Sequence, residues 1–386
     1  MCTLQRVIKH LKNVNQEIRT YVVCLILSGG RKNCADMARS VGISPKPLYK
    51  YLANAESYSK EIEKMLLRYA KQTRIDGVKR TLVIDPTALI KRYAKLIENL
   101  CYDKDGCTKH VEHVLVPVYA SIVDKNVKIP LRLDFWVQEK ITGKKRYKSK
   151  VKIAQDLILY LKEKGLEFDF VSLDGAFPTP DMFSFFQKHG LKFIMRIPRN
   201  RCITRKNGKR MQLKLCPGLK LMRNGREKTI QAELYGDTYF FTAQKRQCKN
   251  GGWEVVFLVS NMDLSAKEQV AAFNLRWPME KINRTTKQKT GSNQCQALNA
   301  EKQEAHILAG FLAHTILEVA QNDKEKYSVD VMVNYLRESH FDDLKALITK
   351  PAKRKQANRI DLDAKSLQKH IQKPSKNAVQ IRGLRA

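Results

Sequence analysis

The sequence predicts an α/β protein with a mixed sheet, preceded by a helical N-terminal domain. Two observations lead to this fold class. Apolar residues recur at helical spacing up to about residue 78, and from residue 79 onward short β-rich runs alternate with helical ones. We therefore expect a helical domain over residues 1–78, an α/β core over 79–330 interrupted by a β-rich insertion at 198–262, and a helical, basic C-terminal tail over 331–386.

The elements of the core follow from local patterns in chain order. Helical periodicity that stops at Gly165 and at Gly190 predicts two helices, and β-rich runs predict strands. The expected strands are 80–85, 114–123, 127–137, 168–173 and 191–197, and the expected helices are 153–164 and 179–189. In the insertion, glycine-containing turns separate hairpin strands expected at 229–235, 238–244 and 253–260. A capping box at Ser265 and Glu268 then begins a helix near residue 266.

A large positive charge restricts the class of partner. The chain has 386 residues, of which 72 are Lys or Arg and 38 are Asp or Glu, so its net charge is +34. Because 43% of the residues are hydrophobic, the chain can bury a sizeable core and is not a disordered basic tail. The expected partner is a polyanion, with nucleic acid ahead of an anionic membrane surface.

The sequence also predicts a cytoplasmic location. The apolar run at residues 21–27 is too short to span a bilayer, and no secretion-signal pattern is expected at the N-terminus. The nine cysteines are an odd, scattered set, which is typical of reduced intracellular thiols.

Two acidic residues follow predicted buried strands. Asp85 comes after the run 81–84, and Asp174 comes after the run 170–173. Ligands and chemistry collect at strand ends in open α/β sheets, and a carboxylate buried there needs a compensating cation or donor. Oxygen ligands of this kind suit Mg²⁺ or Mn²⁺. The alternative is that each Asp only caps a turn.

A third acid lies in a regularly spaced set of side chains near residue 280. Phe273, Arg276, Glu280 and Lys287 recur at close to 3.5 residues, so they are expected to share one helical face. Pro278 complicates this arrangement because it disrupts a helix interior. We therefore expect a break just before it and a new helix that starts there, with Glu280 in the first turn.

Taken together, these acidic motifs resemble those of bacterial DDE transposases. Asp85-Pro86-Thr87 is similar to the Asp-x-Thr of the family's first acidic motif, and Asp174-Gly-Ala-Phe177 resembles the second. The 273–287 stretch resembles the Tyr-Arg-Glu-Lys signature of one large group of insertion-sequence transposases, although Phe273 stands where the family has Tyr. The resemblance covers roughly residues 79–320 and keeps the order of the motifs.

The resemblance implies a DNA transposase with an RNase H-like catalytic core. Asp85, Asp174 and Glu280 would be the catalytic acids and would bind two Mg²⁺ (or Mn²⁺) ions, while Arg276 and Lys287 would hold DNA phosphates. Such a site cuts DNA ends by metal-dependent hydrolysis and then joins the freed 3′ hydroxyl to target DNA. The implied partners are double-stranded terminal inverted repeats, target DNA and a second copy of the chain, with no membrane, in a nucleoid-associated setting.

Near the N-terminus, residues 34–52 have the spacing of a helix-turn-helix. Ala38 permits close helix contact, Gly42 makes the turn, and Leu48 packs the second helix back. Ser44 is expected to cap that helix and Pro45 to start it. The alternative is an ordinary helical hairpin. The side chains expected to face DNA are Lys46, Tyr49 and Lys50.

Basic runs at 144–150, 199–210 and 353–355 lack matching acids in the sequence, which favours phosphate contacts over a merely solvated face. Trp253 is expected in the hairpin core, and the alternative is that it stacks on a displaced base. In the first run, the expected DNA contacts are Lys145, Arg146 and Lys148.

Three alternatives stay open at this point. Cys101, Cys107, His110 and His113 suggest zinc, but their spacing fits no common structural zinc site. The second alternative is a catalytically inactive, domesticated or decayed transposase that binds DNA as a repressor or scaffold. The third alternative is an RNase H-like nuclease that cuts DNA without strand transfer.

Overall fold

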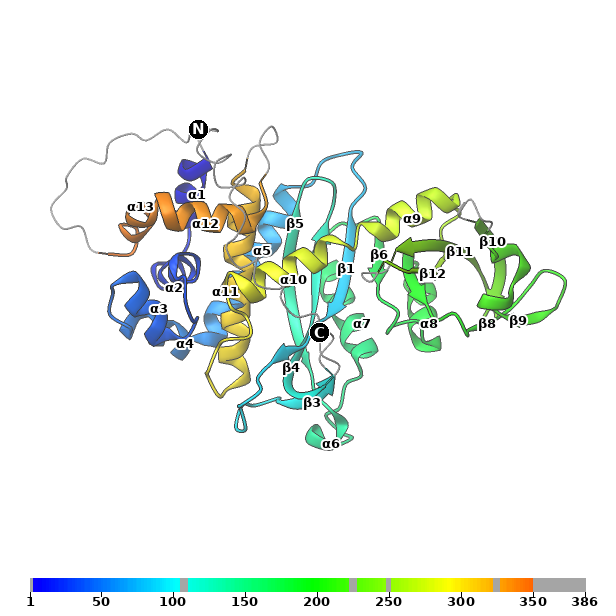
Figure 1. Ribbon diagram of the computed structural model, residues 1–386, viewed down its shortest axis with the longest axis horizontal. Helices are drawn as coiled ribbons and strands as arrows, with labels where there is room; N and C mark the ends of the chain where they lie inside the picture. Colours follow the sequence, from blue (N-terminus) through cyan, green and yellow to red (C-terminus); the bar gives the residue numbers. More distant parts are fainter. Residues whose placement is uncertain (1–2, 105–109, 222–227, 248–250, 322–326, 350–386) are drawn as a thin grey trace, which may run out of the picture. The chain divides into compact units, whose positions relative to one another are not determined.

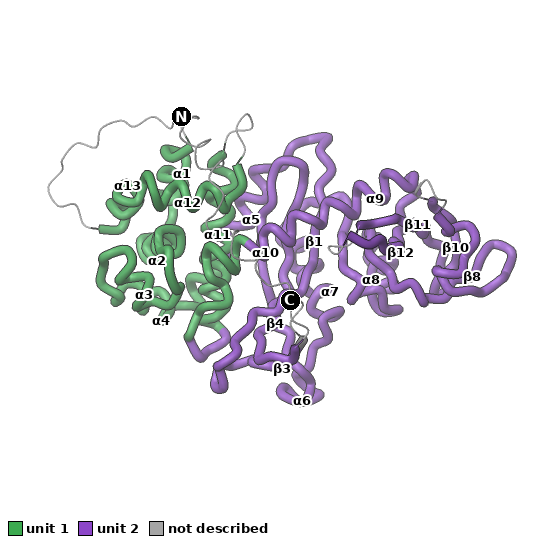
Figure 2. The backbone as a smooth tube through the Cα atoms, viewed as in Figure 1, with its two compact units in different colours: residues 1–62, 285–296, 301–386 green, residues 63–284, 297–300 purple. Residues whose placement is uncertain are grey.

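A computed structural model of the chain describes residues 3–104, 110–221, 228–247, 251–321 and 327–349. The chain forms two compact units (Figure 2). The first unit comprises residues 1–62, 285–296 and 301–386, and the second comprises residues 63–284 and 297–300. These units differ from the three domains expected from the sequence, whose boundaries stay a prediction.

The first unit is built from helices. Its helices are α1 (Thr3–Lys12), α2 (Gln16–Leu27), α3 (Cys34–Val41), α4 (Lys46–Ala53), the start of α5 (Ala55–Gln72), the end of α10 (Pro278–Gln288), α11 (Ala300–Val319), α12 (Val329–Ser339) and α13 (Phe341–Lys345). α2 and α11 are apolar on nearly all sides, and almost every side chain along them is buried. Two buried tyrosine hydroxyls have partners within the unit: Tyr21 bonds His306 Nδ1 over 2.8 Å, and Tyr51 donates to the Ala305 carbonyl over 2.7 Å. The helical character predicted for the N-terminal segment is confirmed.

The second unit contains a twelve-stranded sheet among its described residues (Figure 1). Its strands are β1 (Thr81–Pro86), β2 (Leu89–Ile90), β3 (Cys101–Lys104), β4 (Val111–Val123), β5 (Lys128–Trp136), β6 (Phe170–Leu173), β7 (Phe193–Ile197), β8 (Cys202–Thr204), β9 (Arg210–Gln212), β10 (Lys228–Leu234), β11 (Asp237–Gln247) and β12 (Trp253–Ser260). The helices of this unit are α6 (Glu139–Thr142), α7 (Lys150–Glu163), α8 (Pro180–Lys188), α9 (Ala266–Asn274) and most of α10. α7 packs on β1, β4 and β5, and α9 packs on β7, β11 and β12.

The central part of the sheet runs in the order β5–β4–β1–β6–β7. β5 and β4 pair antiparallel, as do β4 and β1, whereas β1–β6 and β6–β7 are parallel pairs. The predicted mixed sheet is therefore confirmed. In the parallel pair, Ile84 lies opposite Leu173, so the residues that follow, Asp85 near the end of β1 and Asp174 just after β6, lie at the same edge of the sheet.

The β-rich segment 198–262 continues this sheet. β12 pairs antiparallel with β7, with Phe257 opposite Ile197 and Ser260 opposite Ile194. β11 and β10 then extend the same sheet outward. At its inner side, Thr242 donates to the side chain of Gln269 in α9 over 2.8 Å. The segment is therefore joined to the core through the pairing of residues 257–260 of β12 with residues 194–197 of β7.

The helix near residue 266 begins with the predicted capping box. Ser265 and Glu268 cap each other reciprocally, and α9 runs from Ala266 to Asn274. A short turn over residues 275–277 follows, and α10 starts at Pro278. The predicted break before Pro278 is confirmed. The expectation that Phe273, Arg276, Glu280 and Lys287 share one helical face is wrong, because Phe273 lies on α9 and Arg276 in the turn, while Glu280 and Lys287 lie on α10.

A buried ion pair joins three parts of the second unit. The Arg80 guanidinium and the Asp124 carboxylate lie 2.6 Å apart, with side chains only 1% and 2% exposed. Arg80 also donates to the carbonyls of Ala70 and Thr73 at the end of α5. Asp124 accepts the backbone N–H groups of residues 126 and 127 in the β4–β5 turn. Every charge of the pair is thus hydrogen-bonded, which offsets its loss of hydration.

Replacing Arg80 with Met should leave the Asp124 carboxylate buried and uncompensated. We expect a loss of about 3–5 kcal/mol in the free energy of unfolding, measured by urea denaturation. Arg74→Met is the matched control, because the Arg74–Asp169 pair is partly exposed and such pairs contribute only about 0–1 kcal/mol. Equal losses in the two variants would contradict the anchoring role of Arg80.

A buried lysine lies in the first unit beside α2. Lys32 donates from Nζ to the carbonyls of Leu25 and Ser28, at the C-terminal end of the helix. Burial, together with the nearby charges of Arg337 and Lys289, lowers the pKa of Lys32 to about 7. The folded chain therefore binds fewer protons at this position than the unfolded chain between pH 7 and the ordinary lysine pKa, so stability rises with pH across that window.

Lys32→Met should remove this pH dependence. We expect the free energy of unfolding of the unsubstituted chain, minus that of Lys32→Met, to increase by about 2 kcal/mol from pH 7 to pH 9, since each pKa unit corresponds to about 1.4 kcal/mol. Urea denaturation across that pH range measures it. The exposed Lys12 gives the control variant Lys12→Met, for which the same difference should stay flat. A flat difference for Lys32→Met would show that Lys32 keeps its ordinary pKa.

Candidate active site

Asp85 is a buried carboxylate at the end of the central strand β1. The residue is 8% exposed. Its Oδ1 accepts from Nη1 of Arg276 over 3.1 Å, and its Oδ2 accepts from Nδ2 of Asn283 over 3.2 Å. Arg276 lies in the turn between α9 and α10, and Asn283 lies in α10. The two ends of the carboxylate are therefore held by different side chains.

The other two predicted acids influence Asp85 electrostatically. Burial raises the pKa of Asp85 to about 6; Arg276 and the Asn283 hydrogen bond oppose this rise, while the negative charges of Asp174 and Glu280 add to it. Like charges raise a carboxyl pKa only when they are near. The fold therefore brings together three acids that are far apart in the sequence.

Asp174 and Glu280 reach this region from different elements. Asp174 directly follows β6 and is half-buried, and its carbonyl accepts the backbone N–H of Phe177 over 3.2 Å, which closes a turn. Glu280 is exposed in the first turn of α10, and its backbone N–H donates to the Trp277 carbonyl over 3.1 Å. One acid thus follows a buried strand, and the other starts a helix.

The two predicted phosphate-binding residues, Arg276 and Lys287, have different surroundings. Arg276 pairs with Asp85, and its Nε is buried without a hydrogen-bond partner in the described part of the chain. Lys287 is half-buried in the last turn of α10, within the first unit. Asn283 was missed in the sequence. Its position three residues after Glu280 was the available signal, since such residues share a helix face.

The chemistry of these acids fits a hard divalent cation, because carboxylate oxygens are the ligands that Mg²⁺ and Mn²⁺ prefer. Their mutual repulsion around Asp85 is the kind that a cation relieves. However, no three His, Cys, Asp or Glu side chains of the described residues are grouped closely enough to hold a metal. The acids are neighbours in this state, and Arg276 takes one oxygen of Asp85.

The residues expected to read DNA lie on α4, which follows α3 and a turn at Gly42. Gly42 has φ of 69°, a left-handed conformation that glycine adopts without strain. Leu48 is fully buried, as predicted. α4 starts at Lys46, one residue later than expected, with Pro45 as its N-cap. Lys46 is exposed and Tyr49 is 54% exposed.

Two predicted DNA contacts are paired with acids. Lys50 donates to Glu17 of α2 over 2.7 Å, and Lys148 pairs with Asp156 of α7 over 3.0 Å. The expectation that the 144–150 run lacks matching acids is therefore wrong. Lys145 and Arg146 are exposed in the loop before α7. The run at 353–355 lies outside the described residues.

The sequence predicted Trp253 in a hairpin core, and this prediction is wrong. Trp253 is 60% exposed at the start of β12. The Lys245 ammonium lies 4.8 Å from its ring centroid. Trp253 lines a hollow of about 1030 Å³. The basic side chains that line the same hollow are Arg196, Arg199, Lys214 and Lys220. An aromatic face beside several cations suits a nucleotide strand.

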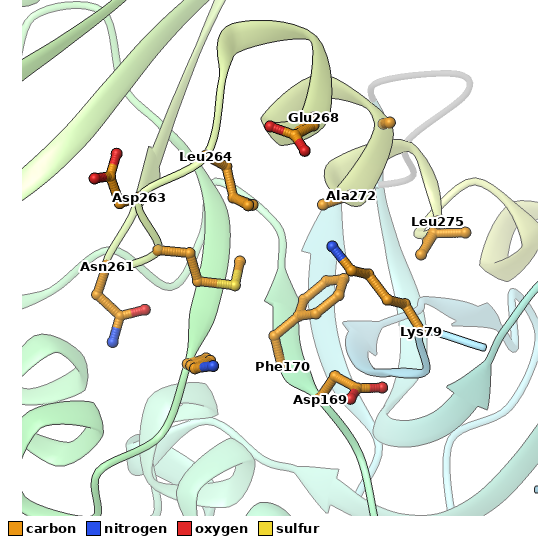
Figure 3. Close-up of a pocket in the computed structure, with 12 residues that line it drawn as sticks. Lys79, Asp169, Phe170, Asn261, Asp263, Leu264, Glu268, Ala272 and Leu275 are labelled. Carbon is orange, nitrogen blue, oxygen red and sulfur yellow. The ribbon is translucent and has the colours of Figure 1, made fainter. Parts of the chain in front are cut away.

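A second pocket, of about 560 Å³, lies at the opposite ends of the strands (Figure 3). The residues that line it include Phe170, Leu275, Asp169 and Asn261. These two polar side chains are used within the protein: Asp169 accepts the Arg80 backbone N–H, and Asn261 bonds the backbone of residues 191 and 193. The pocket adjoins the beginnings of β1 and β6, whereas Asp85 and Asp174 lie at the other ends of these strands. The pocket is therefore separate from the acids.

The structure describes part of the zinc candidate. Cys101 is buried in β3, where its Sγ contacts the Val114 carbonyl at 3.5 Å. His113 Nδ1 lies 2.6 Å from the Ala94 carbonyl. Cys107 lies outside the described residues. Both described contacts are to backbone carbonyls, which favours a structural role for these side chains.

Two protein-family models match the chain. One is described as a transposase DDE domain and matches residues 122–316; the other is described as a DDE superfamily endonuclease and matches residues 6–214. The second match includes Asp85, the first includes Glu280, and both include Asp174. None of the curated proteins compared with the chain matches it. In the part of the chain that the structure describes, no helix has the length and apolar character needed to cross a membrane.

Proposed function

Because each of these models matches about half of the chain or more, the chain belongs to the DDE transposase and endonuclease superfamily, and we propose that it is the DNA transposase of an insertion sequence. It cuts transposon ends and joins them to target DNA. The observation that carries this proposal is the buried Asp85 carboxylate at the end of the central strand, with Asp174 and Glu280 near enough to raise its pKa.

The strand order supports an RNase H-like core. β5–β4–β1 is an antiparallel series, and β6 and β7 continue it in parallel on the other side of β1. In this arrangement the first two acids leave adjacent parallel strands at one edge, where ligands collect in α/β sheets. The pairing of β12 with β7, over residues 257–260 and 194–197, supports a β-rich insertion that is a fixed part of the core.

Asp85, Asp174 and Glu280 are the proposed catalytic acids and metal ligands. Two Mg²⁺ or Mn²⁺ ions bound by them would supply activation of the attacking oxygen and stabilisation of the leaving oxygen. The chain's own contribution is to hold three carboxylates together against their repulsion. Arg276 offsets part of that repulsion in the free protein.

The proposed DNA contacts come from several elements. Arg276 and Lys287 hold phosphates near the cleaved bond, because guanidinium and ammonium groups are strong phosphate donors. The exposed loop residues Lys145 and Arg146 add further phosphate contacts, and Lys148 does so once it leaves Asp156. The exposure of Trp253 favours the alternative in which it stacks on a displaced base.

α3 and α4 form the proposed helix-turn-helix. In this arrangement the exposed start of α4 presents Lys46 and Tyr49 to a DNA groove, and Lys50 joins them when its pair with Glu17 opens. The proposed partners are terminal inverted repeats and target DNA. Two ends must be joined in one event, so a homodimer in the DNA complex is part of the proposal, acting on nucleoid DNA in the cytoplasm.

Asp85→Asn, Asp174→Asn and Glu280→Gln should each reduce cleavage of a terminal-repeat DNA by roughly 10³-fold or more, since metal ions stabilise the transition state by several kcal/mol. DNA binding should be retained. The assay incubates the protein with such an end, Mg²⁺ and a target plasmid, and follows cut and joined products on a gel. Asp181→Asn, at the exposed start of α8, is the matched control and should cut normally.

The products distinguish the candidate functions. Joined products support a transposase, whereas cutting without joining supports a nuclease without strand transfer. Binding without cutting by the unsubstituted chain supports a catalytically inactive DNA-binding protein. Retained cleavage by Asp85→Asn contradicts the assigned acids.

Lys46→Ala should weaken DNA binding and should lower the slope of log K against log salt by about 1, because one phosphate contact is lost. Tyr49→Ala should weaken binding with no change of that slope. Lys50→Ala is the comparison on the same helix, and its effect should be smaller, because the Lys50 ammonium is already paired with Glu17. Fluorescence anisotropy at several salt concentrations measures all three. Unchanged binding in Lys46→Ala would place DNA reading elsewhere.

A further inference from the structure

Asn283 contacts Asp85 but belongs to none of the acidic motifs. Its amide Nδ2 donates to Oδ2 of Asp85 over 3.2 Å. It lies three residues after Glu280 in α10, so the two side chains share one face of the helix. Met279 and Ile282 of the same helix are fully buried, which fixes how the helix is rotated. α10 therefore presents an acid and an amide together to the end of β1.

We propose that Asn283 is a positioning residue that orients the Asp85 carboxylate for a divalent cation. The inference rests on the proposed function, because it assigns a role within the same site. Asn283 acts through Asp85 and is not itself a ligand. Hydrogen-bond donors to a ligating carboxylate fix its direction, and removing such a donor typically reduces metal affinity by about 10–100-fold.

The two oxygens of Asp85 have different partners, and the difference matters. Oδ1 accepts from the charged Arg276, and Oδ2 accepts from the neutral Asn283. A guanidinium cancels the negative charge that attracts a cation, whereas an amide holds the carboxylate without cancelling it. Asn283 is therefore the partner that is compatible with a bound cation.

The different partners of the two oxygens also determine how the Asp85 carboxylate responds when DNA binds. The Arg276 guanidinium binds a phosphate readily and has a buried Nε with no hydrogen-bond partner among the described residues. When a phosphate takes this guanidinium, Oδ1 of Asp85 is released to face a metal. Oδ2 remains bonded to Asn283, so the carboxylate does not rotate away.

The test measures Mn²⁺ binding to the full chain in complex with a terminal-repeat duplex, from the loss of the free-ion electron paramagnetic resonance signal, after subtraction of the loss that the duplex alone causes. Asn283→Leu keeps the number and branching of the side-chain heavy atoms and removes the donor. We expect its Kd for Mn²⁺ to rise about 10-fold or more. Asn283→Gln keeps an amide donor and should recover part of the affinity. Gln288→Leu, at an exposed position of the same helix, is the control and should bind as the unsubstituted chain does.

Cleavage gives a second readout. In Asn283→Leu the Mg²⁺ concentration for half-maximal cutting should rise, while the rate at saturating Mg²⁺ stays near that of the unsubstituted chain. If Asn283→Leu does not fold, Asn283→Ala takes its place in both measurements. Unchanged Mn²⁺ affinity in the folded variant overturns the proposal. Retained cleavage in Asp85→Asn would instead overturn the proposed function, so the two failures are distinguishable.

Discussion

The buried pair of Arg80 and Asp124 is the constraint on which the second unit depends. It ties the end of α5 and the β4–β5 turn to the residue just before β1. Since β1 is flanked by β4 and β6, fixing its start sets the register of the central strands. The far end of β1 carries Asp85. A hydrogen-bonded charge pair at one end of the strand thus determines where a carboxylate stands at the other.

That carboxylate is energetically unfavourable in its surroundings. Burial and two neighbouring acids work against the ionised form of Asp85, and Arg276 and Asn283 only partly compensate. Proteins commonly keep such groups where chemistry needs them, at a cost in stability. The site is therefore an unfavourable arrangement of charges held by a rigid sheet. The Arg80–Asp124 pair contributes to that rigidity by fixing the start of β1.

Local patterns in the sequence predicted the elements well. The β-rich runs, the capping box at Ser265 and the break before Pro278 all depend on nearby residues, and each is present in the structure. The prediction that Phe273 and Glu280 share a helical face failed for a physical reason. Their spacing is helical, but a turn interrupts the helix between them. The prediction that Trp253 lies in a hairpin core failed because the start of β12 is exposed and only residues 256–260 of the strand are buried, which the burial preference of tryptophan does not reveal.

The site was only partly visible in the sequence. Asp85 and Asp174 could be found because each follows an apolar strand, but pairings such as Lys50 with Glu17 and Lys148 with Asp156 depend on tertiary packing. Asn283 has the same difficulty, since its spacing from Glu280 predicts a shared helix face but not a contact with Asp85. The matches to family models cover the segments that contain the three acids, but they say nothing of these side-chain contacts, which only the structure shows.

The contact between Asp85 and Arg276 spans 191 residues of chain. Contacts between such distant segments form late in folding, and a ribosome delivers the N-terminal segments first. While the chain is still being synthesised, Asp85 exists without Arg276, Asn283 or Glu280. An incomplete product that ends before Glu280 therefore has no assembled acid cluster, and it also lacks α11, whose residues 305 and 306 hydrogen-bond Tyr51 and Tyr21 of the N-terminal helices. Both units thus become complete only after the C-terminal part of the chain has been synthesised.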